Sequence, residues 1–193
     1  SDVRESLERV AREVRHLTRL TNDLLLTTQL KASPPVMREA VRLKELLEEV
    51  VAEVWVLAEG LDLGLQAEEV TVLGDRDLLK QMVLNLVDNA IKFTPAGGRV
   101  ELHLHCDGRR ACVTVVDTGC GILPEHLPRV MEPFYKADPA RGSGAGGAGL
   151  GLAIVGQIAT LHGGQVEVCS EVGVGTRVTV RLPLPPQSAG GTA

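Results

Sequence analysis

The N-terminal region repeats apolar residues at alternating spacings of four and three, which is the pattern of a heptad seam along a helix. Val3, Leu7, Val10 and Val14 begin this seam, and arginine and glutamate occupy most positions between them. Additional leucines widen the apolar stripe towards its end, so the pattern suits a helix bundle better than a two-stranded coiled coil. We predict a helix over residues 1–31 that packs on a partner helix, because one helix cannot bury its own seam, or else on the rest of this chain.

Two prolines separate this helix from the remaining sequence. Residues 32–35, Ala-Ser-Pro-Pro, end the helical pattern, because proline has no amide donor and restricts the residue before it. We therefore predict one unit over residues 1–33, a second over residues 34–183, and a disordered tail rich in proline, glycine and serine over residues 184–193.

The second unit interleaves helical periodicity with short runs of β-prone residues. One run, Ala-Cys-Val-Thr-Val-Val at residues 111–116, is strongly typical of a strand. We predict helices over 44–58, 76–93 and 150–161, and strands over 39–43, 61–66, 70–73, 99–105, 111–116, 165–170 and 176–182. Residues 117–149 are irregular and rich in glycine. Because the elements do not form regular βαβ repeats, we expect an α/β sandwich with one mixed sheet and helices on one face.

Composition narrows the classes of function. The chain of 193 residues has 20 lysines and arginines against 25 aspartates and glutamates, a formal charge of −5, and only 2% aromatic residues. Such a chain lacks the basic face and the stacking residues of a nucleic-acid-binding domain, and its core must be aliphatic. No apolar run reaches the length of about 18 residues that a membrane span needs. We therefore expect a cytoplasmic domain with no nucleic-acid partner, and a membrane anchor in a longer parent protein stays open.

The cysteines and histidines do not form a clear metal-binding pattern. His103 and His105 share one face of a predicted strand, a spacing that allows a metal pair but is more simply an exposed strand face. The scattered cysteines favour free, buried thiols over disulfides or a zinc site, and they are Cys106, Cys112, Cys120 and Cys169.

A glycine-rich segment precedes the last predicted helix. Six of the ten residues from Gly142 to Gly151 are glycine, and the helical sequence follows at once. Glycines let main-chain N–H groups converge on an anion, and the helix N-terminus adds its partial positive charge. The segment therefore favours phosphate binding over a flexible linker. It is neither a Walker A loop, since no Gly-Lys-Ser/Thr closes it, nor a dinucleotide fingerprint, since no strand directly precedes it.

Two amides lie on one face of the helix predicted over 76–93. Asn85 and Asn89 are four residues apart and Lys92 follows three residues later, so the three side chains share a helical face. Such a face is often merely solvated. Beside an anion-binding loop, however, the amides become candidate ligands for Mg²⁺ and phosphate, because Mg²⁺ takes oxygen donors of this kind.

An aspartate and two spaced glycines follow the strand predicted over 111–116. Asp117 can accept a hydrogen bond from an exocyclic amine, while Gly119 and Gly121 allow a flat ligand to approach the backbone closely. Taken alone, the same residues are typical of a β-turn opened by aspartate. The segment gains functional weight only beside the other two motifs.

In this order the three motifs resemble those of the GHKL ATPase superfamily, and more closely the catalytic and ATP-binding domain of bacterial sensor histidine kinases. The resemblance extends over about residues 39–183, and residues 1–31 are similar to the second helix of the family's dimerisation and histidine-phosphotransfer hairpin. It implies the Bergerat-type ATP-binding fold, a sandwich of the expected kind. The matching segments are the N box at Asn85–Pro95, the G1 box at Asp117–Ile122, the F box at Glu132–Lys136, the G2 box at Gly147–Ala153, and the closing strands at His162–Gly164 and Ser170–Thr176.

The resemblance also implies roles for individual residues. Asn89 would coordinate the Mg²⁺ that bridges the phosphates of ATP, assisted by Asn85, and Lys92 would face phosphate. Asp117 would bond to the amine of adenine, and Thr176 would support that contact from a neighbouring strand.

Loop residues complete the implied ATP site. The segment from about Glu125 to Gly146 would be a mobile lid over ATP, and its many glycines suit a segment of low local stability. The family often has arginine where Lys136 stands, and lysine keeps the charge without the bidentate fork. The loop residues implied to contact the cofactor are Gly119, Gly121, Ile122, Tyr135, Lys136, Arg141, Gly147, Gly149, Leu150, Gly151 and Leu152.

The family transfers the γ-phosphoryl group of ATP to a histidine that is followed by an acid and a basic-Thr-Pro turn. None of the five histidines here has this context, and His16, on the right kind of helix, is followed by Leu-Thr-Arg. We therefore expect the chain to bind Mg-ATP without phosphorylating itself. The resemblance implies as partners an acceptor-histidine helix of the same or a second kinase subunit, a response regulator, and a second copy in a full-length homodimer. The alternatives are a GHKL ATPase or serine kinase of another branch, and a non-catalytic nucleotide-binding or dimerisation module.

Overall fold

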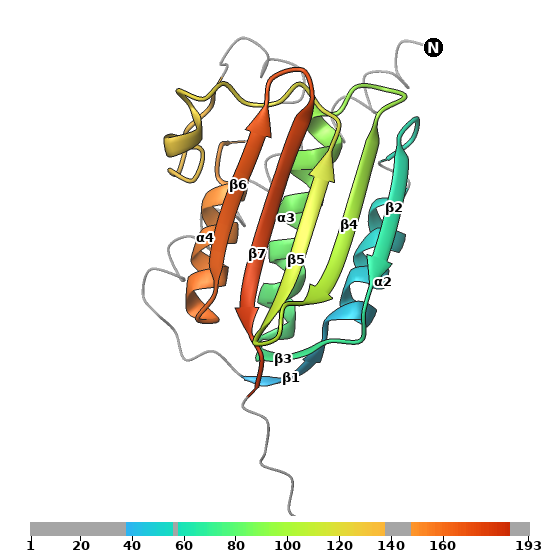
Figure 1. The fold of residues 1–193 in the computed structure, drawn as a ribbon, viewed down its shortest axis with the longest axis vertical. Coiled ribbons are helices and arrows are strands. Elements are labelled where there is room, and N and C mark those ends of the chain that lie inside the picture. Colours follow the sequence, from blue (N-terminus) through green and yellow to red (C-terminus); the bar gives the residue numbers. More distant parts are fainter. Residues whose placement is uncertain (1–37, 56–57, 138–147, 186–193) are drawn as a thin grey trace, which may run out of the picture.

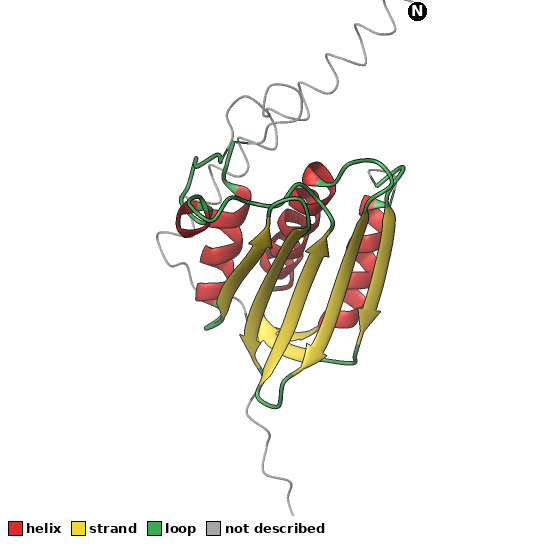
Figure 2. Ribbon diagram, turned by 45° about the horizontal axis from the view of Figure 1, so that its top comes forward, coloured by secondary structure: helices red, strands yellow, loops and turns green. Residues whose placement is uncertain are grey.

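A five-stranded mixed sheet with helices on one face organises the described part of the chain, which in this computed structural model comprises residues 38–55, 58–137 and 148–185 (Figure 1). No described helix covers the other face (Figure 2). This arrangement confirms the expected sandwich. The helix predicted over 1–31, the proline break and the tail from residue 186 lie outside the described residues.

The elements follow one another in the predicted order. The strands are β1 (Glu39–Arg42), β2 (Asp62–Ala67), β3 (Thr71–Gly74), β4 (Arg99–Cys106), β5 (Arg110–Asp117), β6 (Gln165–Glu171) and β7 (Gly175–Pro183). The helices are α2 (Leu43–Val54), α3 (Arg76–Phe93) and α4 (Gly151–Leu161), with a short 3₁₀ helix at Leu127–Arg129. The helix predicted over 44–58 therefore ends earlier than expected, at Val54, and the 3₁₀ helix lies in a segment predicted to be irregular.

The strand order of the large sheet is β2-β4-β5-β7-β6. β2 runs parallel to β4, and every other neighbouring pair is antiparallel. β1 and β3 form a separate antiparallel pair, so the expectation of a single sheet was wrong. The physical reason is that each of these four-residue strands leads almost directly into a helix, so the pair lies at the base of the helix layer (Figure 1).

The first and last turns of α3 follow from local chemistry. Asp75 precedes the helix, and its Oδ1 accepts hydrogen bonds from the backbone N–H groups of Asp77 and Leu78, both at 3.1 Å. Thr94 follows the helix with extended backbone angles, because the next residue is Pro95 and disfavours a helical conformation before it. The helix therefore spans the length that the sequence predicts.

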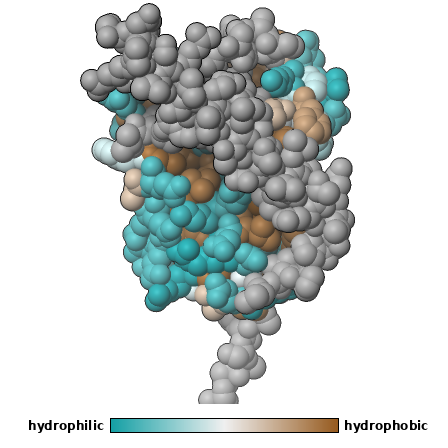
Figure 3. Space-filling model, turned by 180° about the vertical axis from the view of Figure 1, so that it is seen from behind, coloured by the Kyte–Doolittle hydropathy of each residue, from teal (hydrophilic) through white to brown (hydrophobic). Residues whose placement is uncertain are grey.

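The core between the sheet and the helices is aliphatic, as predicted. Val100, Leu102 and Leu104 alternate along β4 and are buried against the helix layer. No Trp, Phe or Tyr residue is buried: the tryptophan and both phenylalanines are exposed, and the single tyrosine is half-buried. Seen from behind, the coloured part of the surface combines hydrophilic areas with smaller hydrophobic ones (Figure 3). An ion pair joins Glu49 of α2 to Arg76 of α3.

A buried histidine joins the turn before α3 to the turn after α4. The Nε2 atom of His162 accepts a hydrogen bond of 3.0 Å from the backbone N–H of Asp75. Its Nδ1 lies 2.8 Å from the carbonyl oxygen of Ile158, to which it must donate because a carbonyl only accepts. Both ring nitrogens are therefore used, and the imidazole is neutral with its proton on Nδ1.

Two expectations about exposure were wrong in part. All four cysteines are free, but only Cys112 is buried: Cys106, Cys120 and Cys169 lie at a strand end, in a turn and on an edge strand, where packing is incomplete.

The strand predicted over 176–182 continues to Pro183. The N–H of Leu184 then bonds to the carbonyl of Arg109, so this residue of the predicted tail packs on the core.

Candidate functional site

Four segments meet at the end of the large sheet opposite β1 and β3 (Figure 1). They are the last turns of α3, the turn after β5, the start of α4 and the turn between β6 and β7. The N–H of Cys120 donates to the carbonyl of Phe93 at 3.3 Å, and the N–H of Gly173 donates to the carbonyl of Cys120 at 2.9 Å. The turn after β5 is thus held between α3 and the β6–β7 turn.

The amides of Asn85 and Asn89 face the start of α4. A Cβ atom at Gly151 would lie 3.0 Å from Asn89 Nδ2 and 3.7 Å from Asn85 Oδ1, so glycine allows the close approach of the two helices. The Nδ2 atom of Asn85 is buried without a hydrogen-bond partner, and no side chain caps the N-terminus of α4. A buried donor without a partner and an uncapped helix N-terminus together suit an anion such as phosphate.

Asp117 ends β5 as a half-buried carboxylate. Its Oδ1 accepts hydrogen bonds from the N–H of Gly119 at 2.8 Å and from the N–H of Thr176 at 3.2 Å. Burial raises the pKa of the Asp117 carboxyl above its ordinary value, while these two backbone hydrogen bonds act in the opposite direction. The fold therefore holds a carboxylate at a place that makes its charge costly, which is typical of a ligand-binding position.

Both glycines of this turn are required by the backbone around them. A Cβ atom at Gly119 would lie 2.5 Å from the carbonyl oxygen of Phe93 and 2.7 Å from Asp117 Oδ1. Gly121 has a φ of +70° and lies against the carbonyl of Glu171. The atoms that lie close to these glycines belong to the protein itself, and the close approach of a ligand to the same turn stays a prediction.

One serine that the sequence analysis did not single out joins this turn to the sheet. The Oγ atom of Ser170 accepts a hydrogen bond of 2.9 Å from the N–H of Ile122. It also lies 2.9 Å from both the carbonyl oxygen of Gly175 and the Oγ1 of Thr176. The only sequence signal for this role was its place at the start of the segment Ser170–Thr176.

The segment before the glycine-rich loop is bonded to the last part of that loop. The N–H of Phe134, a residue with a φ of +66°, donates to the carbonyl of Gly149 at 2.9 Å. The hydroxyl of Tyr135 lies 2.6 Å from Nδ1 of His126, and the guanidinium of Arg129 stacks over the tyrosine ring at 4.3 Å. His126 and Arg129 were not among the sequence candidates, because their partner lies beyond a 3₁₀ helix that the sequence did not predict.

The remaining candidates differ in how they relate to this end of the sheet. Lys92 extends over the ring of its neighbour Phe93, with Nζ 4.8 Å from the ring centre. The side chain of Leu150 belongs to the core and Leu152 packs against it, so these leucines support the loop from inside. Lys136 is exposed. The other two candidates, Arg141 and Gly147, lie outside the described residues.

Oxygen donors at this end fit a magnesium ion only together with oxygens from a ligand. In the described ranges, no group of three or more His, Cys, Asp or Glu residues could hold a metal ion. Mg²⁺ in proteins often takes one or two side-chain oxygens and completes its shell with substrate phosphates and water. The amide oxygens of Asn85 and Asn89 beside the α4 N-terminus therefore fit a Mg²⁺ ion that arrives with a phosphate ligand.

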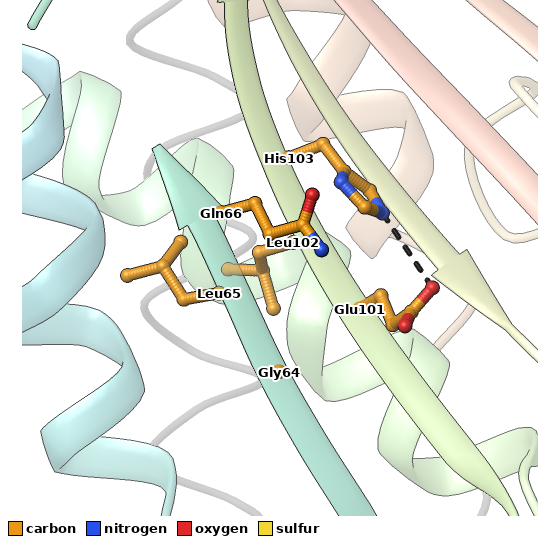
Figure 4. Close-up of a pocket in the computed structure, with 6 residues that line it drawn as sticks. All are labelled: Gly64, Leu65, Gln66, Glu101, Leu102 and His103. Atoms are coloured by element: carbon orange, nitrogen blue, oxygen red, sulfur yellow. Dashed lines mark ion pairs between the residues drawn. The ribbon is translucent and has the colours of Figure 1, made fainter. Parts of the chain in front are cut away.

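A shallow pocket of about 120 Å³ lies elsewhere, on β2 and β4 (Figure 4). Its polar part consists of Gln66, Glu101 and His103, and the His103 Nε2 lies 3.6 Å from a Glu101 carboxylate oxygen. His103 thus contacts a residue of its own strand, as expected for an ordinary strand face. None of the candidate residues from the three motifs lines this pocket.

A family model and curated relatives match this chain. The family model for histidine kinase-, DNA gyrase B-, and HSP90-like ATPases matches residues 74–186. The sensor protein SrrB of Staphylococcus aureus is 36% identical over 190 residues, which cover 95% of this chain and 32% of the relative. The chain thus spans about a third of the length of the curated relatives it matches.

Solved structures show the same fold. The mycobacterial sensor histidine kinase MprB is 32% identical, with a TM-score of 0.68, over 76% of this chain and 97% of that chain. Full-length ShkA, solved in complex with AMPPNP, is 32% identical, with a TM-score of 0.80, over 95% of this chain and 39% of that one. Separately, no helix in the described part of the chain is both long and apolar enough to cross a membrane.

Proposed function

Since the chain belongs to the histidine kinase-, DNA gyrase B-, and HSP90-like ATPase family and contains the ATP-binding catalytic domain of a sensor histidine kinase, we propose that it binds Mg²⁺-ATP and presents the γ-phosphate to an acceptor histidine. The acceptor would come from another helix, because none of the five histidines of this chain has the sequence context of an acceptor. Binding would take place where α3, α4 and the turn after β5 meet.

One observation carries this proposal. Gly151 at the start of α4 lies against the amides of Asn85 and Asn89, and one of these amides has a buried donor without a partner. A phosphate there would accept from that donor and from the main chain of the glycine-rich loop. Asp117, which the turn after β5 holds near the end of α3, would take the base of the same nucleotide.

The phosphate end of the site would depend on α3 and the glycine-rich loop. The amide oxygen of Asn89 would bind Mg²⁺, with Asn85 assisting, and Lys92 would face phosphate. Mg²⁺, when bound, would neutralise charge on the phosphate oxygens. The contribution of the glycines Gly147, Gly149 and Gly151 would be close main-chain approach.

The base end and the loop over the nucleotide would complete the site. Asp117 would accept from the amine of adenine, with Thr176 beside it and the turn residues Gly119, Gly121 and Ile122 shaping the floor. Tyr135, Lys136 and Arg141 would contact the nucleotide from the lid. Because phosphoryl transfer depends mainly on positioning and charge, these contacts would set the reaction geometry.

The partners follow from the same proposal. The full-length protein would act as a homodimer, with the acceptor-histidine helix in the same or the second subunit. A response regulator would receive the phosphoryl group from that histidine. These partners are those of a sensor histidine kinase. Residues 1–33 would belong to the helical hairpin that carries dimerisation and phosphotransfer.

The first experiment measures nucleotide binding by the whole chain. Isothermal titration with ATP is expected to show binding that requires millimolar Mg²⁺. Asn89→Ala removes the amide oxygen proposed to bind Mg²⁺, and it is expected to weaken ATP binding by about 1.5–3 kcal/mol, a size taken from the range for polar contacts with charged groups. The control is Gln165→Ala, which removes an exposed amide on β6, away from α3. Full affinity in Asn89→Ala would refute the assignment.

The second experiment separates kinase from hydrolase. The chain is incubated with labelled ATP, with and without a separately supplied acceptor hairpin from a related kinase. Acid-labile label on the hairpin and none on this chain is the expected result. Label on this chain alone would contradict the missing acceptor, and steady release of ADP without any acceptor would identify a hydrolytic ATPase.

A further inference from the structure

Ser170 lies at the centre of a small hydrogen-bond network beside Asp117. Asp117, Thr176 and Ser170 are direct cross-strand partners on β5, β7 and β6, so their side chains form a row on one face of the sheet. All three residues are half-buried. The Ser170 hydroxyl oxygen lies 2.9 Å from the N–H of Ile122, from the carbonyl oxygen of Gly175 and from Thr176 Oγ1.

The donors and acceptors around this hydroxyl fix where its proton lies. A serine hydroxyl has one proton and two acceptor lone pairs. The Gly175 carbonyl can only accept, so the proton of Ser170 must point to it. If the proton pointed to Thr176 instead, two bare oxygens would face each other at 2.9 Å. The two lone pairs of Ser170 then accept from the Ile122 N–H and from the hydroxyl of Thr176.

This network determines what Thr176 shows to a ligand. The proton of Thr176 is directed to Ser170, so the rest of that hydroxyl consists of acceptor lone pairs. The neighbouring carboxylate of Asp117 is also an acceptor only, and its Oδ1 is bonded to the Thr176 N–H. The row therefore presents acceptors without donors at the place proposed for the base.

We propose that Ser170 is a positioning residue that orients the Thr176 hydroxyl and so makes the base subsite select a purine with an exocyclic amine over one with a carbonyl in the same place. An amine donates to both acceptors. A carbonyl would meet lone pairs, and a site that leaves buried polar groups unpaired rejects such an analogue. The proposal rests on the proposed function, namely ATP binding at this end of the sheet.

The experiment compares ATP with inosine triphosphate, which carries a carbonyl where adenine carries the amine. Affinities of the whole chain for both nucleotides are measured with Mg²⁺ by titration calorimetry. The wild type is expected to prefer ATP. In Ser170→Ala the Thr176 proton is free to turn towards a carbonyl, so the preference for ATP is expected to fall about fivefold, the scale of one hydrogen bond.

Two further variants separate orientation from mere stability. Ser170→Thr keeps the hydroxyl and is expected to show the same preference for ATP as the wild type. Thr179→Val removes a hydroxyl that lies 3.1 Å from Thr114 Oγ1 on the other face of the same sheet, and it is expected to leave the preference unchanged. Thermal unfolding of each variant shows that the folded protein is compared.

Each outcome bears on a different statement. If Ser170→Ala weakens ATP and inosine triphosphate by the same factor, Ser170 is only structural and the inference fails, while ATP binding stands. A wild type that binds both nucleotides equally overturns the selectivity in the same way. A wild type that binds neither nucleotide refutes the proposed function itself, and the inference with it.

Discussion

Two aspartates at opposite ends of the domain make the same kind of hydrogen bond. At the start of α3, Oδ1 of Asp75 accepts from two backbone N–H groups, both at 3.1 Å. At the end of β5, Oδ1 of Asp117 accepts from two others, those of Gly119 at 2.8 Å and Thr176 at 3.2 Å. Local geometry alone does not tell the two residues apart.

Their surroundings differ in how the polar groups are satisfied. Around Asp75 the polar atoms are hydrogen-bonded to other groups of the protein. The backbone N–H of Asp75 donates to Nε2 of the buried His162, whose Nδ1 is bonded to the carbonyl of Ile158. Around Asp117, burial raises the pKa of the carboxyl, and the nearby α3 carries an Asn85 amide nitrogen without a partner. Natural folds accept such local conflicts at functional sites, so this contrast supports the proposal that one end serves stability and the other binds a ligand.

The largest effect is expected at the stable end. His162→Ala removes two hydrogen bonds, leaves the N–H of Asp75 without its acceptor and opens a cavity, so the free energy of unfolding should fall by about 3 kcal/mol. ATP affinity of the folded protein should not change. Urea unfolding and titration calorimetry measure the two quantities. His105→Ala, at an exposed histidine, is the control, and a stable variant with weak ATP binding would reverse the comparison.

The next effect belongs to the ligand end. Asp117→Asn keeps an oxygen that accepts both backbone N–H groups but loses the charge that would receive an amine. ATP affinity should fall by about 1.5–3 kcal/mol. Because burial raises the pKa of the carboxyl, ionisation at neutral pH costs the fold stability, and the uncharged amide removes that cost. The melting temperature should therefore stay equal or rise, and a clear fall would place Asp117 among the structural residues.

A smaller and opposite result is expected for the first aspartate. Asp75→Ala removes the N-cap of α3 and should lower the free energy of unfolding by about 1 kcal/mol, without a change in ATP affinity. Asp75→Asn keeps a capping oxygen and should restore stability. Denaturant unfolding and calorimetry on the same samples test both statements. Weaker ATP binding in a folded Asp75→Ala protein would show that the two ends are coupled.

The sequence predicts the features of this structure that depend on neighbouring residues, and it does not predict those that depend on residues far apart in the chain. The bounds of α3 follow from a capping aspartate, apolar periodicity and a proline, all within one segment, and structure and prediction agree on 76–93. The pairing of β1 with β3 was missed, because it depends on partners brought together by a helix and a strand between them. The site shows the same division. The motif residues are visible in sequence, whereas Ser170 bonds to an N–H that lies 48 positions away along the chain.

The smallest effect concerns pH and tests the ligand end without changing its shape. The pKa of Asp117 lies above the ordinary aspartate value of 3.8, so the carboxylate gains its proton earlier than usual as pH falls. The acceptor for the amine is then lost, and ATP affinity should weaken as pH decreases through the raised pKa. Protonation of the triphosphate also weakens binding, so the quantity to follow is the affinity ratio of wild type to Asp117→Asn. This ratio should have its largest value at neutral pH and decrease in acid, because only the wild type has a carboxyl to protonate at position 117. A ratio that does not change with pH would mean that the charge of Asp117 does not contact the base.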